Sequence, residues 1–86
     1  MVDIQGIVIR LHNELLKERE IDKESSLEME MRPRNGITSE SIVSLLLDIE
    51  DELDIELDDY LAQIRECKTI GLLIDIVIEA YEKQNS

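Results

Sequence analysis

Residues 38–53 read TSESIVSLLLDIEDEL, and this stretch decides the fold. Its apolar side chains recur every three or four residues, which is the period of one helical face. The stripe consists of Ile42, Leu46, Ile49 and Leu53, widened by Val43 and Leu45. Thr38 is a suitable N-cap, and Ile37 before it is spaced to pack on Ile42 as a hydrophobic staple. We predict a helix from Ser39 to about Leu53.

C-terminal to this helix, residues 54–57 form a short extended link. Asp58 or Asp59 can then cap a brief helix that runs through Leu61 and Ile64. Thr69 can cap a last helix, whose apolar face comprises Ile70, Leu73, Ile74, Val77, Ile78 and Tyr81. Leu72 and Ile76 make that helix apolar nearly all round, so we expect it to lie deep in the protein.

N-terminal to residues 38–53, a first helix is predicted over about residues 4–20, with Asp3 as its cap. Its stripe consists of Ile4, Ile7, Val8, Leu11, Leu15 and Leu16. Residues 21–37 read as a long loop with Leu27, Met29 and Met31 as apolar anchors, and long loops are often functional. Each amphipathic segment needs a partner for its apolar face, so we predict one all-α domain over residues 1–86. This domain is a four-helix bundle with a short third helix and no sheet.

Composition and charge narrow the classes of function. A chain of 86 residues builds one core, and without Phe or Trp this core must be aliphatic. The net charge is −12, and residues 35–64 contain nine acidic residues but no Lys or Arg. This excess disfavours nucleic-acid binding, which needs cations against phosphates, and favours partners with basic surfaces.

No apolar run is long enough to cross a membrane, and no basic segment followed by an apolar one suggests export. Cys67 is the only cysteine, so an internal disulfide is excluded. We expect a cytoplasmic monomer.

Catalytic and metal sites are hard to place in this sequence. His12 and Cys67 are far apart in the chain, and we interpret His12 as an ordinary residue at the edge of a helical stripe and Cys67 as an incidental thiol. An EF-hand loop starting at Asp48 would have Leu53 where glycine is required, so a solvated acidic face is the better interpretation. We expect no enzymatic activity.

Ser39 is the remaining candidate. It is the first residue of the predicted second helix, where unpaired amides and the helix dipole favour an attached phosphate. Ser41 points to another side and can bond back to the cap, and Ser44 lies deeper in the helix, where we expect access to be poorer.

From Gly36 to about Tyr81 the chain resembles the acyl and peptidyl carrier protein family. The family's Gly-x-Asp-Ser-apolar segment corresponds to Gly36-Ile37-Thr38-Ser39-Glu40, and Val43, Leu45–Leu47, Ile49–Asp51 and Glu52-Leu53-Asp54 follow its second helix without a gap. Residues 55–59 look like the link into its third helix. Lys68-Thr69-Ile70 looks like the opening of its fourth.

The resemblance implies that Ser39 carries a 4′-phosphopantetheine arm with cargo held as a thioester. It implies that a phosphopantetheinyl transferase attaches the arm, and that cargo-loading and cargo-accepting enzymes recognise Val43, Leu47, Glu50 and Asp51. Aliphatic side chains between the second and third helices would shelter a short acyl chain.

Thr38 stands where the family usually has Asp, and Glu40 where it usually has Leu, Ile or Met. The cargo stays open, because the Val-x-Leu-Leu-Leu-like second helix is shared by standalone peptidyl carriers and the D-alanyl carrier. Fatty acyl, aminoacyl and peptidyl groups all fit. The alternative function is a non-catalytic acidic adaptor or inhibitor that binds a basic protein without a prosthetic group, and a third is a small metal buffer.

Overall fold

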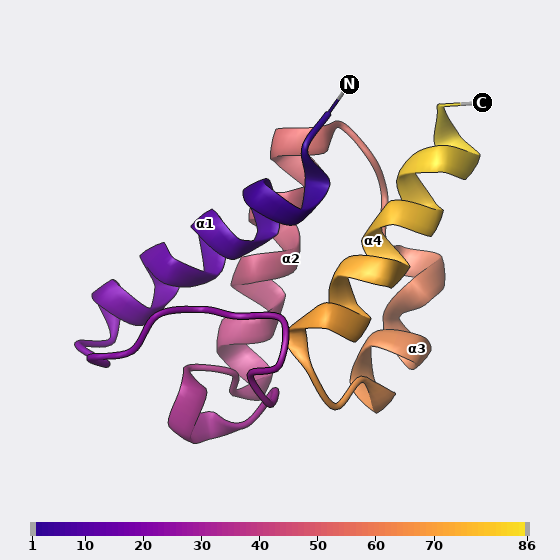
Figure 1. Ribbon diagram of the computed structural model, residues 1–86. Coiled ribbons are helices and arrows are strands. Elements are labelled where there is room, and N and C mark those ends of the chain that lie inside the picture. The colour runs from indigo at the N-terminus through magenta and orange to yellow at the C-terminus, as the bar shows by residue number, and fades with distance from the viewer. Residues whose placement is uncertain (1, 86) are drawn as a thin grey trace.

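The computed structural model describes residues 2–85 and confirms the predicted all-α architecture (Figure 1). Its four helices are α1 (Ile4–Glu18), α2 (Ser39–Leu53), α3 (Leu61–Glu66) and α4 (Ile70–Gln84). Two 3₁₀ turns, η1 (Pro33–Asn35) and η2 (Asp58–Tyr60), precede α2 and α3. Within the described range no strand forms, and Glu30 and Thr69 make an isolated β-bridge.

Helix α1 begins at its predicted cap, where the Asp3 carboxylate accepts a hydrogen bond from the Gly6 amide at 3.0 Å. It ends two residues earlier than predicted, because Glu20 adopts the left-handed conformation with φ of 59°. The amide of Ile21 then bonds to the Leu16 carbonyl at 2.9 Å, and that of Glu20 to Lys17 at 3.1 Å. This is a Schellman ending, and it turns the chain back toward the bundle.

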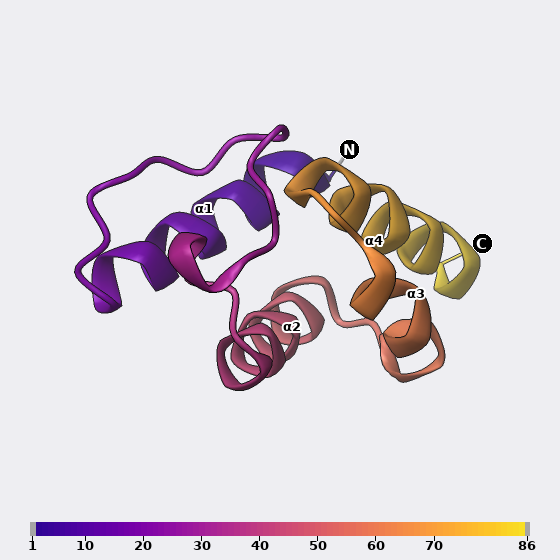
Figure 2. The ribbon, with the colours of Figure 1, turned by 90° about the horizontal axis from the view of Figure 1, so that it is seen from below.

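The three long helices bury their apolar stripes against one another. Helix α1 packs against both α2 and α4, and α3 fills the space beside α4 (Figures 1 and 2). The core is aliphatic apart from Tyr60, as the composition requires, and its most buried members include Val8, Leu16, Leu45, Ile49, Leu57, Ile70, Leu73 and Val77. Burial of these side chains is the main favourable contribution to folding.

Helix α4 is less enclosed than its composition suggests. Leu73 and Val77 are fully buried, whereas 47% of Leu72 is exposed and Ile76 is half-buried. The expectation of a helix buried deep in the protein was therefore wrong for one face, because no neighbouring element covers the Leu72 side.

Residues 21–37, here called the strap, cross from the C-terminal end of α1 to the start of α2 (Figure 2). The strap passes the N-terminus of α4, where the Leu27 and Met29 carbonyls accept the amides of Gly71 and Ile70 at 2.9 Å each. These bonds satisfy first-turn donors of α4. Met29 and Met31 pack against the core as predicted, whereas the Leu27 side chain is 41% exposed and is not part of that core.

None of the helices in residues 2–85 is both long enough and apolar enough to cross a membrane.

Candidate functional site

The start of α2 is held by a reciprocal cap between Thr38 and Ser41. The Thr38 hydroxyl oxygen accepts the Ser41 amide at 3.1 Å, and the Ser41 hydroxyl oxygen accepts the Thr38 amide at 2.7 Å. Ser41 also donates its hydroxyl proton to the Gly36 carbonyl and is 2% exposed. Thr38 is confirmed as the cap, and Ser41 is a structural residue with its hydroxyl fully engaged.

Gly36 makes the turn that leads into this cap. Its φ is +81°, in the left-handed region, and a Cβ at this position would lie 3.3 Å from Leu16 Cδ2 and 3.5 Å from Ile21 Cδ1. Both reasons favour glycine here. The turn therefore lies against Leu16 in the last part of α1.

Ser39 is exposed, and its hydroxyl makes no hydrogen bond within the described chain. The amides of Ser39 and Glu40 likewise meet no acceptor among residues 2–85. An anionic group attached to Ser39 would therefore face free donors and the positive end of the α2 dipole.

Accessibility does not separate Ser39 from Ser44, contrary to the expectation from the sequence, since Ser44 is also exposed. Ser44 instead borders a small recess between α1 and α2 that includes Glu14 and Asp48. Its surroundings are acidic and hold no free helix-terminal amides, so Ser39 is the better place for a phosphate.

A pocket of about 370 Å³ opens beside Ser39, between α2, α3 and the strap. Its lining is mostly aliphatic and consists of Met31, Ile37, Thr38, Ser39, Ile42, Val43, Leu46, Leu61, Ile64, Arg65 and Cys67. The position between the second and third helices matches the place where the resemblance implied a shelter for a short acyl chain.

Ser39, Val43, Leu47 and Asp51 are spaced by four residues and form one slanting row along α2. Val43 is 54% exposed and Leu47 is 59% exposed, so both present apolar surface to solvent. Leu61 on α3 adds a third exposed aliphatic group at the pocket. The row leads from Ser39 over an apolar surface to an acidic end.

Glu50 is less exposed than Val43, Leu47 and Asp51, the other residues expected to contact partner enzymes. Its carboxylate accepts the Leu57 amide at 2.7 Å, and its backbone carbonyl accepts the Ile55 amide at 3.2 Å. The side chain is half-buried and holds the link between α2 and η2. A substitution here would alter the link as well as the surface charge.

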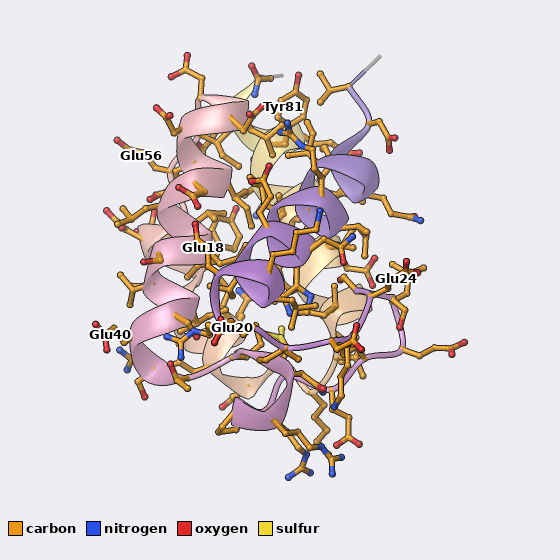
Figure 3. All side chains as sticks on the ribbon, turned by 90° about the vertical axis from the view of Figure 1, so that its left-hand side faces the viewer. Glu18, Glu20, Glu24, Glu40, Glu56 and Tyr81 are labelled. Atoms are coloured by element: carbon orange, nitrogen blue, oxygen red, sulfur yellow. The ribbon has the colours of Figure 1, made fainter. Side chains whose placement is uncertain are left out.

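The remaining acidic residues are spread over the surface and do not converge on one site. In Figure 3 the labelled Glu40 and Glu56 lie at opposite ends of α2, and Glu24 lies on the strap far from both. Among residues 2–85 no group of three His, Cys, Asp or Glu side chains could hold a metal ion. The arrangement offers no support for the metal-buffer interpretation.

The positive charge of Arg32 and Arg34 is partly offset by Glu30, which they approach at 2.6 and 3.4 Å. The hydrogen bond from Arg32, followed by its charge, lowers the pKa of the Glu30 carboxyl. Cys67 lines the pocket, but burial and then Asp75 raise the pKa of its thiol. The thiol is therefore protonated at neutral pH and a poor nucleophile.

The interpretation of His12 as a boundary residue was wrong. The side chain is fully buried, with Nδ1 2.6 Å from the Ser25 hydroxyl and Nε2 2.9 Å from the Asn35 carbonyl. A Ser-His pair thus exists that the sequence did not reveal, because its partners lie 13 and 23 residues away. General acid catalysis would need an accessible imidazole, and this one has no exposed surface.

Comparison of the chain with protein-family models, with curated proteins and with solved structures found no match. The site is interpreted from its geometry and from the residues quoted above.

Proposed function

We propose that this protein is a standalone carrier that holds an acyl, aminoacyl or peptidyl group as a thioester on a 4′-phosphopantetheine arm attached to Ser39. The observation that supports this best is the contrast between two serines in one turn. Ser39 is exposed with a free hydroxyl beside unpaired amides, whereas Ser41 is buried and bonded on all sides. The chemistry of transfer would belong to the thiol of the arm and to the partner enzymes.

The surface beside Ser39 also suits a carrier. Exposed Val43 and Leu47 would contact the transferase and the loading enzymes, and Asp51 would meet basic residues at their rims. The neighbouring aliphatic pocket has room for a short acyl chain.

The second candidate is an acidic adaptor or inhibitor that uses no prosthetic group. It is favoured by Glu40, which places a negative charge directly after Ser39 where carriers offer an apolar contact. On this reading the same exposed row binds a basic protein without modification of any serine.

Intact mass spectrometry separates the two candidates. The unmodified chain is incubated with coenzyme A and a broad-specificity phosphopantetheinyl transferase, with an established carrier protein as a positive control. We expect one phosphopantetheine adduct per chain. A chain that stays unmodified with several such enzymes, while the control is converted, would favour the adaptor.

We predict that Asp51→Lys slows modification by the transferase at low salt, because it reverses a charge on the docking row. The difference from the wild type should shrink as ionic strength rises, since exposed charges are screened beyond about 8–10 Å at 0.1–0.15 M salt. The measurement is kcat/KM for adduct formation over a salt series.

The matched control for this prediction is Glu82→Lys, the same charge change on α4, where the residue is exposed and away from the row. Equal slowing by both variants would show that net charge matters and the α2 row does not. Glu50→Lys is unsuitable because it also breaks the bond to the Leu57 amide.

A further inference from the structure

His12 joins α1 to both ends of the strap. Ser25 lies near the beginning of the strap and Asn35 near its end, and the two bond to opposite nitrogens of the same buried ring. Asn13, the next residue on α1, accepts the Ser25 amide at 2.7 Å through its side-chain oxygen. Two neighbouring residues of one helix thus hold a segment of the chain that is otherwise irregular.

In the neutral ring, the bonding pattern fixes the tautomer. A backbone carbonyl can only accept, so Nε2 carries the proton and donates it to Asn35. Nδ1 is then the acceptor for the Ser25 hydroxyl. A second proton would make Nδ1 a donor, and the Ser25 hydroxyl could still accept it by rotating its own proton away. What disfavours the second proton is burial, because the ring would then carry a positive charge with no solvent contact.

Within the described chain, no carboxylate lies where it could stabilise a second proton on His12 by an ion pair. Lys23 on the strap donates to the Asn35 side-chain oxygen at 3.0 Å. Its ammonium therefore bonds to the same residue whose backbone carbonyl accepts from the ring. Glu30 contributes its backbone carbonyl to Asn35, while its carboxylate is taken by Arg32 and Arg34. Residues three and four positions from His12 on α1 are all apolar, namely Val8, Ile9, Leu15 and Leu16. No carboxylate from α2, α4 or any other part of residues 2–85 forms an ion pair with the ring. Burial lowers the pKa of His12, and the bond to Asn35 opposes this in part.

The end of the strap that His12 holds lies next to the candidate site. Asn35 is followed directly by Gly36 and by the cap that starts α2. The side-chain Nδ2 of Asn35 donates to the Glu30 backbone carbonyl at 2.7 Å, which holds two parts of the strap together. Met31 and Ile37, one from the middle and one from the end of the strap, line the pocket beside Ser39. Movement of the strap would therefore change one wall of that pocket.

We propose that His12 is a pH-sensitive latch: the neutral ring holds the strap against α1, and protonation of the ring releases the strap and opens one wall of the pocket beside Ser39. The latch does not rest on the carrier assignment, because the strap can be followed in the unmodified chain.

The direction of the pH effect follows from linkage. The latched state binds the second proton more weakly than the released state, in which His12 has its ordinary pKa of about 6.5. The latch is at full strength above that pH. As the pH falls from there to the lower pKa of the latched state, it weakens by up to about tenfold per pH unit, and below both values it changes no further.

The experiment follows His12 and the strap together by NMR in the intact chain. His12 is the only histidine, so its titration is unambiguous. The probes are the Met31 amide, which bonds from the strap to the Lys68 carbonyl, the Ile37 amide, which bonds to the Arg32 carbonyl within the strap, and the Ile70 amide, which bonds to the Met29 carbonyl of the strap. Their hydrogen exchange is compared with exchange at Val77 in the middle of α4. We expect His12 to titrate below its ordinary value, and the strap amides to lose protection relative to Val77 at the same midpoint.

Two variants test the cause. His12→Gln keeps an N–H that can reach the Asn35 carbonyl and does not titrate, so the loss of strap protection should no longer depend on pH. Lys23→Met removes the ammonium that bonds to the Asn35 side-chain oxygen and so weakens the latched state, and it should therefore raise the His12 midpoint and the strap midpoint together. The latch is overturned if strap protection falls in His12→Gln as it does in the wild type, if the two midpoints separate in Lys23→Met, or if Val77 loses protection along with the strap.

Discussion

Replacing Ser39 with alanine abolishes attachment of the phosphopantetheine arm, and this is the largest effect we expect of any single substitution on the proposed function. The substitution removes the only proposed acceptor oxygen, so the residual modification should be undetectable rather than merely slow. Little stability should be lost, since Ser39 is exposed and its hydroxyl is bonded to nothing within the described chain. The measurement is intact mass after incubation with coenzyme A and the transferase.

Ser44→Ala is the matched control, because Ser44 is exposed on the same helix and its removal should leave the adduct in place. Ser41→Ala is less informative, since it would leave the Thr38 amide and the Gly36 carbonyl without their partner, at a cost of about 1–3 kcal/mol for each buried group left unsatisfied. An adduct that persists in Ser39→Ala would show that another residue carries the arm.

The largest effect on stability is expected for Leu73→Ala, with Leu72→Ala as its control. Leu73 is fully buried, and truncation of a buried leucine costs about 2–5 kcal/mol through lost burial and the cavity left behind. The total free energy of unfolding of an 86-residue domain is roughly 4–13 kcal/mol, at 0.05–0.15 kcal/mol per residue. The Leu73→Ala variant should therefore be strongly destabilised or unfolded.

Leu72 is adjacent in sequence and has the same side chain, but 47% of it is exposed. Leu72→Ala should lower the free energy of unfolding by well under half as much as Leu73→Ala does. Urea denaturation followed by circular dichroism measures both losses. Equal loss for the two variants would mean that the exposed face of α4 is covered in solution, for example by a second copy of the chain.

Much of the fold was predictable because the determining interactions are local. The period of the apolar residues depends only on helical geometry, which is why the existence of all four helices was predicted. The expected cap of the third helix was wrong, because Asp58 and Asp59 lie in the 3₁₀ turn η2 and α3 begins at Leu61 without a side-chain cap. Thr38 and Thr69 were recognised as caps because a cap and the amide it accepts are three residues apart. The exposure of Ser39 followed from its place in the first turn of α2 for the same reason.

The features that went wrong or unnoticed depend on residues distant in sequence. His12 looked like an edge residue because its partners Ser25 and Asn35 come from the strap, whose path has no periodic pattern. The bond from the Leu57 amide to the Glu50 carboxylate went unnoticed because it exists only after the link has folded back along α2.

The sequence by itself determined the helices, the caps at Asp3, Thr38 and Thr69 and the position of Ser39, since each depends on neighbours within one turn of the chain. Only the tertiary structure decided which apolar faces are covered, that His12 is buried, and that a pocket opens beside Ser39. Burial and cavity shape arise from segments brought together by packing, and helical periodicity carries no information about which segment will cover a given face.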